Sequence, residues 1–222
     1  VVDLGRRLPD LPNLSVALKT DQLADAKKVA SQVDADFALA DAEYERTVPF
    51  PGKIFCIGVN YGGRNAEYSD STSNNKPSVF VRFPESLTGH KQPLVRPPES
   101  VQLDYEGEIV AVIGRRGRRI PRSQARDHIA GLTLGNEGTI RDWLRHAKFN
   151  VTQGKNWESS GSMGPWLVPI EEIGNLEDLR LQTRVNGELR QDDTVASMAF
   201  PIEFQIEYLS PFITLEPGDV IY

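Results

Sequence analysis

One segment that begins acidic and ends apolar constrains this chain more than any other. It runs from Asp104 to Gly114 and reads Asp-Tyr-Glu-Gly-Glu-Ile-Val-Ala-Val-Ile-Gly. Alternate side chains of a strand share a face, so Glu106 and Glu108 point to one side and Ile109 points to the other. Both faces turn apolar after Glu108, which is typical of a strand covered on both sides. The segment is therefore predicted to be an interior strand with two carboxylates at its first end.

Buried glutamates need a positive partner. Ionised carboxylates remain away from water only when they are paired with a cation or bound to a metal. We therefore expect a cation near Glu106 and Glu108. The alternative is that this end of the strand projects into water and that the two side chains are merely solvated. The pattern alone leaves both interpretations open.

Composition bounds the partners of the chain. Its 222 residues are 39% hydrophobic and 25% charged, which suits a main domain with at most a small appendage. The formal net charge of −6 argues against binding of nucleic acid through its phosphates. No apolar run approaches the roughly 20 residues of a membrane span, so we expect neither a nucleic-acid nor a membrane partner. The single cysteine, Cys56, fits a reducing compartment and therefore the cytoplasm, and we expect it in the core.

Two prolines and a glycine divide the chain near residue 50. The connection Thr47–Gly52 separates a small N-terminal segment, residues 1–50, from a main domain, residues 51–222. One helix is predicted in the first part, near Asp21–Val33. The main domain ends on the opening of a strand, so we expect it to continue beyond Tyr222.

The main domain is predicted to be rich in short strands. We expect strands near residues 53–59, 78–83, 106–113, 132–136 and 179–185, the last followed by a hairpin turn at Asn186-Gly187. Short helices are predicted at residues 123–129 with Ser123 as cap, at 140–148, and from Pro201 to Leu209.

Seven motifs, in order, resemble the fumarylacetoacetate hydrolase family over residues 53–222. They are Ile57-Gly58-Val59-Asn60-Tyr61, Asp104-Tyr105-Glu106-Gly107-Glu108, Gly135-Asn136-Glu137 with Arg141-Asp142, Gly154-Lys155, Gly164-Pro165-Trp166, Val185-Asn186-Gly187 and Leu215-Glu216-Pro217-Gly218-Asp219. The resemblance implies an α+β, β-rich fold, namely the mixed β-sandwich roll of the family's C-terminal domain. It also implies a homodimer with a divalent cation in a cleft.

The resemblance assigns the cation to three acidic residues, Glu106, Glu108 and Glu137. Glu137 departs from the family pattern, in which Asp is more usual after the Asn, so its longer side chain should alter the metal position or its waters. Three carboxylates without a histidine favour Mg²⁺ over Zn²⁺, with Mn²⁺ and Ca²⁺ as alternatives. Lys155 matches a family lysine near the substrate, where it would orient a carboxylate or stabilise an oxyanion.

Arg64 and Glu67 are a second departure. Hydrolytic members of the family resemble one another in carrying a His at the position of Arg64, which with the Glu activates water. Because Arg is no general base near neutral pH, Glu67 is expected to move a proton alone while Arg64 grips a second carboxylate. The alternatives are that Glu67 still activates water, or that the two residues form a structural ion pair.

Three further residues are expected near the substrate. Arg141 follows Glu137 closely enough to support the metal site or bind substrate. Tyr61 is expected either to line the pocket or to pack beneath it, and Gln153 is a weaker candidate for a substrate hydrogen bond.

The resemblance thus implies a Mg²⁺-dependent enzyme of aromatic catabolism that acts on a small 2-oxo or 2-hydroxydienoate acid through a metal-bound enolate. The nearest subgroup is that of the 2-hydroxyhepta-2,4-diene-1,7-dioate isomerases. The alternatives are a C–C hydrolase of acylpyruvate or fumarylpyruvate type, an oxo-acid decarboxylase, and a non-catalytic metal-binding protein.

Overall fold

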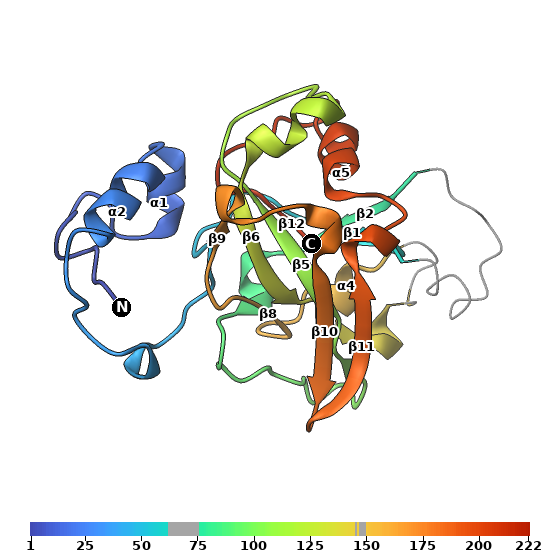
Figure 1. Ribbon diagram of the computed structural model, residues 1–222. Helices are drawn as coiled ribbons and strands as arrows, with labels where there is room; N and C mark the ends of the chain where they lie inside the picture. The colour runs from blue at the N-terminus through green and yellow to red at the C-terminus, as the bar shows by residue number, and fades with distance from the viewer. Residues whose placement is uncertain (62–75, 145, 147–149) are drawn as a thin grey trace.

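A curled mixed sheet forms the centre of the molecule (Figure 1). The computed structural model describes residues 1–61, 76–144, 146 and 150–222. The strand order is β2-β1-β12-β5-β6-β8-β3, and β9 pairs with β6 beside this path. The sheet is mixed because β1 runs parallel to β12 and β3 parallel to β8, whereas the other pairs are antiparallel. The bounds are β1 Ile54–Gly58, β2 Ser78–Val81, β3 Leu87–Thr88, β5 Gly107–Ile113, β6 Ile129–Asn136, β8 Gly161–Met163, β9 Val168–Pro169 and β12 Val220–Ile221.

Strand β5 lies between two hydrophobic clusters, as the sequence predicted. Val110 and Val112 pack in one cluster, which also contains Cys56 and Tyr222. Ile109 and its alternate neighbours pack in the other. The apolar end of β5 is therefore covered on both faces, and of the two glutamates at its other end Glu106 is buried and Glu108 is half-buried.

Two smaller ribbons flank the sheet. Strands β10 (Arg180–Val185) and β11 (Glu188–Thr194) form a hairpin, and both turn residues, Asn186 and Gly187, have positive φ, as a type I′ turn requires. The predicted hairpin is confirmed. Strands β4 (Leu103–Asp104) and β7 (Thr139–Ile140) pair antiparallel and bring the entry of β5 beside the exit of β6.

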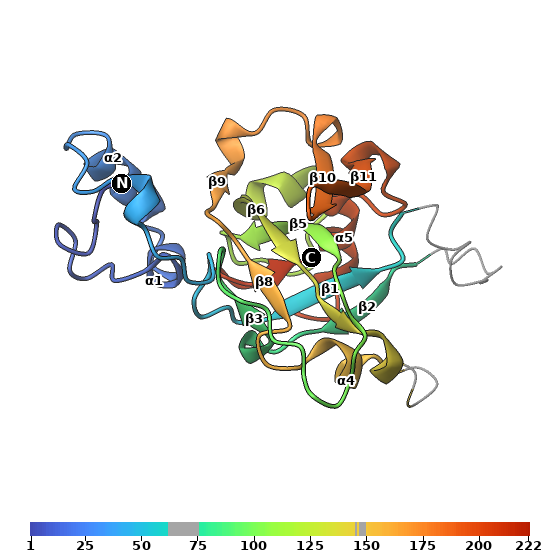
Figure 2. The ribbon, with the colours of Figure 1, turned by 90° about the horizontal axis from the view of Figure 1, so that it is seen from below.

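The N-terminal helices lie to one side of the sheet (Figure 1, Figure 2). They are α1 (Leu14–Lys19), α2 (Leu23–Ala30) and the single 3₁₀ turn η1 (Leu39–Asp41). Helix α2 confirms the helix expected near Asp21–Val33. Leu18 of α1 joins the cluster that contains Val110, so this segment packs on the core of the sheet.

The other helical predictions are confirmed only in part. Helix α5 (Ile202–Leu209) begins after Pro201, as expected, and a short helix α4 spans Thr152–Lys155. The helix predicted at 123–129 is instead the 3₁₀ segment η3 (Arg122–His128), whose N-cap residue is Pro121 and not Ser123, and β6 begins directly after it at Ile129. Of the helix predicted at 140–148, the described residues form the single turn η4 (Arg141–Trp143), which begins after Ile140 because Ile140 pairs with Leu103 in β7. Residues 145, 147 and 148 of this prediction lie outside the described part of the chain.

Four more single 3₁₀ turns join the strands. They are η2 (Pro84–Ser86), η5 (Ile170–Glu172), η6 (Leu176–Asp178) and η7 (Val195–Ser197). Within the part of the chain that the structure describes, no helix has the length and apolar character needed to cross a bilayer.

Candidate functional site

Three glutamates meet where β5 begins and β6 ends. Glu106, Glu108 and Glu137 each offer a carboxylate oxygen, and these atoms all lie within 4.8 Å of one another. Glu108 lies in β5, Glu106 immediately precedes that strand, and Glu137 follows β6, its antiparallel neighbour. The structure thus brings together the three carboxylates to which the family resemblance assigns the cation.

Hydrogen bonds of the backbone and of two polar side chains hold this arrangement in place. The Glu137 N–H donates to the carbonyl of Glu106 at 2.7 Å, and the Glu106 N–H donates to Oδ1 of Asn136 at 2.9 Å. The Thr139 hydroxyl donates to Oε1 of Glu106 at 2.7 Å. The positions of the two buried glutamates are therefore coupled through the main chain.

Residue 107, between Glu106 and Glu108, is a glycine because the β10–β11 hairpin packs closely against the backbone there. Its N–H donates to Oε1 of Gln191 at 2.8 Å. A Cβ on Gly107 would lie 2.0 Å from Oγ1 of Thr183, so a larger residue would push the hairpin away. Glycine is required here by close approach and not by an unusual φ.

Lys155 is the buried counter-charge of the cluster. Its Nζ lies 2.9 Å from Oε2 of Glu106 and 2.7 Å from Oε1 of Glu137. Burial alone would lower the pKa of Lys155, but the carboxylates of Glu137 and Glu106 outweigh burial and raise it. The ammonium group therefore stays protonated at neutral pH.

The two buried glutamates differ in their electrostatic surroundings. Burial would raise the pKa of Glu106, but the charges of Lys155 and Arg141 outweigh it and lower that pKa. Arg141 contributes through an Nη2 contact of 2.9 Å to Oε1 of Glu106, and its Nε also donates to Oδ2 of Asp104 at 2.7 Å. Glu137 is almost wholly buried, and burial, together with the Glu106 charge, raises its pKa despite Lys155.

The donor set fits a hard divalent cation. Oε1 of Glu137 is buried, and the ammonium nitrogen of Lys155 lies 2.7 Å from it. Carboxylates this close to one another repel, and a divalent cation among them offsets that repulsion. Three carboxylates are ligands of the kind that Mg²⁺, Mn²⁺ and Ca²⁺ prefer.

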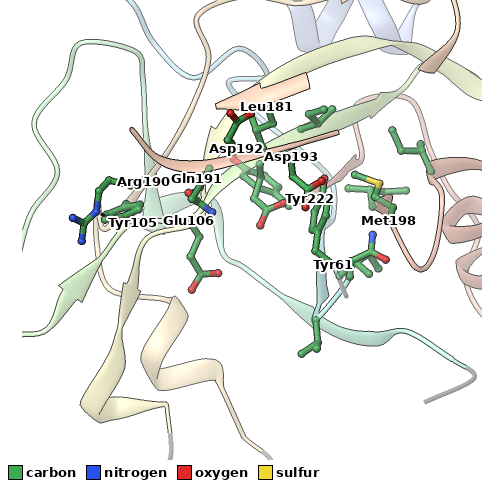
Figure 3. Close-up of a pocket in the computed structure, with 18 of the residues that line it drawn as sticks. Tyr61, Tyr105, Glu106, Leu181, Arg190, Gln191, Asp192, Asp193, Met198 and Tyr222 are labelled. Carbon is green, nitrogen blue, oxygen red and sulfur yellow. Dashed lines mark hydrogen bonds between the residues drawn. The ribbon is translucent and has the colours of Figure 1, made fainter. Parts of the chain in front are cut away.

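A cleft of about 360 Å³ borders this cluster (Figure 3). Glu106, Glu108, Arg141 and Tyr61 belong to its lining, whereas the more deeply buried Glu137 and Lys155 do not. Burial, followed by the charges of Glu108 and Asp193, raises the pKa of Tyr61 to about 12, so its phenol stays protonated at neutral pH. Tyr61 therefore lines the cleft as a hydrogen-bond donor.

Strand β11 supplies lining residues that the sequence analysis missed. They are Arg190, Gln191, Asp192 and Asp193. Arg190 Nε donates to the hydroxyl of Tyr105 at 3.0 Å, and these two residues lie opposite Tyr61 and Met198 across the cleft (Figure 3). The sequence signal that could have identified these residues is a strand without an apolar face, because such a strand does not cover a core.

One candidate from the sequence lies away from the cleft, and two others cannot be placed. Gln153 is not part of the cleft lining, and its carbonyl accepts a hydrogen bond from Nε1 of Trp157 at 2.6 Å. Arg64 and Glu67 lie outside the described residues, so their roles rest on the sequence alone.

Comparison with known proteins agrees with this geometry. The family described as fumarylacetoacetate (FAA) hydrolase C-terminal matches residues 53–222. The chain belongs to this family. The predicted α+β, β-rich fold of the family's C-terminal domain is thereby confirmed.

Three similar members of the fumarylacetoacetate hydrolase family carry the names of enzymes. This chain is 37% identical over 189 residues to a 4-hydroxyphenylacetate degradation bifunctional isomerase/decarboxylase of Salmonella dublin, covering 82% of the chain and 44% of the relative. It is 42% identical over 190 residues to an oxaloacetate tautomerase of Bacillus subtilis, and the match covers 83% of this chain and 62% of the relative. The crystal structure of 2-hydroxyhepta-2,4-diene-1,7-dioate isomerase from Mycobacterium marinum matches with a TM-score of 0.73 at 29% identity, covering 83% of this chain and 67% of that one. The chain therefore spans less than two thirds of the length of both curated relatives.

Proposed function

We propose that this chain is a Mg²⁺-dependent enzyme that isomerises 2-hydroxyhepta-2,4-diene-1,7-dioate or a closely similar 2-oxo diacid. The observation that carries the proposal is the group of three carboxylates whose oxygens lie within 4.8 Å of one another, two of them on buried residues. The names of the Salmonella and Mycobacterium relatives support the choice of substrate class.

Glu106, Glu108 and Glu137 would hold the cation. When bound, the cation would act as a Lewis acid that polarises the 2-oxo group of the substrate and favours enolisation. Mn²⁺ is expected to replace Mg²⁺ because both accept oxygen ligands.

The residues of the chain itself bind and orient the substrate. Arg141 lines the cleft and offers positive charge to a substrate carboxylate, although Glu106 and Asp104 hold part of its guanidinium. Lys155 keeps Glu106 and Glu137 in position through its two contacts. The protonated hydroxyl of Tyr61 supplies a hydrogen bond at the other side of the cleft.

Glu67 is our candidate for the group that moves the proton between substrate carbons. Arg64 stands where hydrolytic relatives would need a base, and its charge suits the second carboxylate of a diacid. Proton transfer without attack by water favours isomerisation over C–C hydrolysis. We also propose that residues 51–222 form the catalytic domain, that the enzyme is a homodimer, and that it acts in the cytoplasm.

The Bacillus relative favours a second candidate, keto–enol tautomerisation of oxaloacetate. The same proton transfer would then act on a shorter diacid. The two candidates differ in the length of substrate that turns over fastest, which a series of diacids of increasing length would reveal.

A product analysis tests the proposal. The protein is incubated with Mg²⁺ and a panel of 2-oxo diacids, 2-hydroxydienoates and acylpyruvates, while ultraviolet absorbance follows the enol and mass spectrometry identifies products. We expect a shifted chromophore at unchanged mass, lost in Glu106→Gln and retained in Glu171→Gln, a change in an exposed glutamate whose partner is Lys27.

Three other results would contradict isomerisation. Two smaller acids would show C–C hydrolysis, and loss of CO₂ would show decarboxylation. Binding of Mn²⁺ with no turnover of any substrate would favour the non-catalytic metal-binding alternative.

A further inference from the structure

Arg82 is a buried arginine for which the proposed function gives no role. It directly follows β2, and only 2% of its surface is exposed. Within the described ranges its hydrogen-bond acceptors are serine and backbone oxygens instead of a carboxylate. Because a buried guanidinium is expensive to desolvate, its position is expected to serve more than packing.

Its hydrogen bonds join three segments of the chain. Nε donates to Oγ of Ser86 at 3.0 Å, and Nη2 donates to the carbonyl of the same residue at 3.3 Å. Nη1 donates to the carbonyl of Gly138 at 3.0 Å, and Nη2 also donates to Oγ of Ser160 at 3.1 Å. The guanidinium thus ties η2 to the residue that follows Glu137 and to the start of β8.

Two of these bonds lie where the backbone is most crowded. A Cβ on Gly138 would lie 1.8 Å from the carbonyl oxygen of Ser160, so the two main chains are in direct contact. Arg82 donates hydrogen bonds to both residues of this contact, Gly138 and Ser160. Glu137 precedes Gly138, and its own N–H donates to the carbonyl of Glu106 at 2.7 Å. The turn that carries Glu137 is therefore fixed at successive residues.

We propose that Arg82 is a positioning residue of the metal site, which sets the affinity for the divalent cation by fixing the turn that carries Glu137. This inference rests on the proposed function, because it requires Glu137 to be a ligand. Arg82 is not one of the residues that line the cleft, and none of the hydrogen bonds described above goes to a carboxylate oxygen. Its effect on the cation is exerted through the main chain.

The sign of the effect separates positioning from charge. As a positive charge near the site, Arg82 repels a cation, so its removal would tighten cation binding if charge dominated. If positioning dominates, its removal weakens binding, because one of three ligands loses its fixed geometry. Changes in partners that orient ligands typically cost about 10–100-fold in metal affinity.

A titration with Mn²⁺ tests the inference without any enzymatic assay. Free Mn²⁺ is measured by electron paramagnetic resonance in the wild type, Arg82→Met and Arg82→Lys. We expect Arg82→Met to weaken Mn²⁺ binding at least about tenfold. Arg82→Lys keeps the positive charge but loses the planar set of N–H donors, so it should also weaken Mn²⁺ binding. If Arg82→Met does not fold, Arg82→Lys alone tests whether positioning or charge dominates.

Arg46 provides a matched control. Its guanidinium also binds η2, through the carbonyl of Pro84, and the first residue of β3, through the carbonyl of Leu87. Its third acceptor is the carbonyl of Pro49 and not the Glu137 turn. Arg46→Met should therefore lower the midpoint of thermal unfolding while Mn²⁺ affinity stays within about twofold of wild type. A merely structural role of Arg82 would make the two arginine variants behave alike.

The outcomes distinguish the two proposals. Unchanged or tighter Mn²⁺ binding in both Arg82 variants would overturn the role of Arg82 and leave the metal site standing. If the wild type itself binds no Mn²⁺ that Glu106→Gln abolishes, the metal site and the proposed function fail together.

Discussion

Two lysines in this molecule have nearly the same partners in opposite surroundings. Lys155 lies 2.9 and 2.7 Å from Glu106 and Glu137, and its side chain is 6% exposed. Lys27 of α2 lies 3.1 and 2.7 Å from Glu171 and Glu172, with 51% of its side chain exposed. Each ammonium group bridges two carboxylates at almost equal distances.

The difference shows that burial, and not distance, decides what such a contact does. Water solvates the Lys27 group whether or not its partners are present, so these ion pairs contribute little to stability. Around Lys155 no water replaces a lost partner, and an unpaired buried charge is costly. The buried lysine can therefore hold carboxylates in a geometry that their mutual repulsion opposes.

The largest effect is expected from Lys155→Met. It leaves Glu106 and Glu137 buried without their shared counter-charge, so we expect the free energy of unfolding to fall by about 3–5 kcal/mol. Activity should be lost. Chemical denaturation measures the first effect, and excess Mg²⁺ should recover part of the stability because it binds only the folded state. A variant as stable as wild type without Mg²⁺ would remove the contrast between the two lysines.

Lys53→Met should have an intermediate effect. Lys53 Nζ lies 2.6 Å from Oδ2 of Asp219, and the lysine side chain is 26% exposed while that of the aspartate is 0% exposed. In the variant, Asp219 still accepts hydrogen bonds from the backbone N–H groups of residue 53 and Glu216, which are 2.8 Å long in the wild type. We therefore expect a loss of about 1–2 kcal/mol in the free energy of unfolding. An effect as large as that of Lys155→Met would break the proposed order.

A pH series tests an exposed pair with good geometry. Hydrogen bonds from Arg7, and then from the Asp3 backbone, lower the pKa of Asp36 from 3.8 to about 2. A depressed carboxyl pKa stabilises the fold above the unfolded value and loses this effect as the pH falls through the folded value. The difference in thermal unfolding midpoint between wild type and Asp36→Asn should thus be present above about pH 4 and vanish near pH 2. A difference that persists unchanged below pH 2 would contradict the assignment.

The smallest effect is expected from Lys27→Met. Both partners, Glu171 and Glu172, are exposed, so their carboxylates are solvated equally well without the lysine. The thermal unfolding midpoint should match that of wild type within error, and Mn²⁺ affinity should not change. A clear loss of stability would show that the contact between α2 and η5 matters more than its exposure suggests.

The amino-acid sequence determined the elements whose signal is local. The alternation from Glu106 to Ile113 predicted an interior strand, and Asn186-Gly187 predicted the hairpin that the structure contains. The helices predicted at residues 123–129 and 140–148 are, within the described residues, the 3₁₀ segments η3 and η4, and the pairing of Ile140 in β7 delays the second one. The choice of Glu106, Glu108 and Glu137 as ligands came from family motifs, since nothing local joins residue 137 to residue 106.

Only the tertiary structure decided what surrounds those glutamates. These contacts join residues that are far apart in the sequence. Lys155 lies between two of the glutamates, the β10–β11 hairpin packs on Gly107, and Arg82 donates a hydrogen bond to Gly138. Side-chain spacing specifies which face of a strand a residue occupies. It does not specify which distant segment covers that face, because such contacts depend on how all the elements pack together.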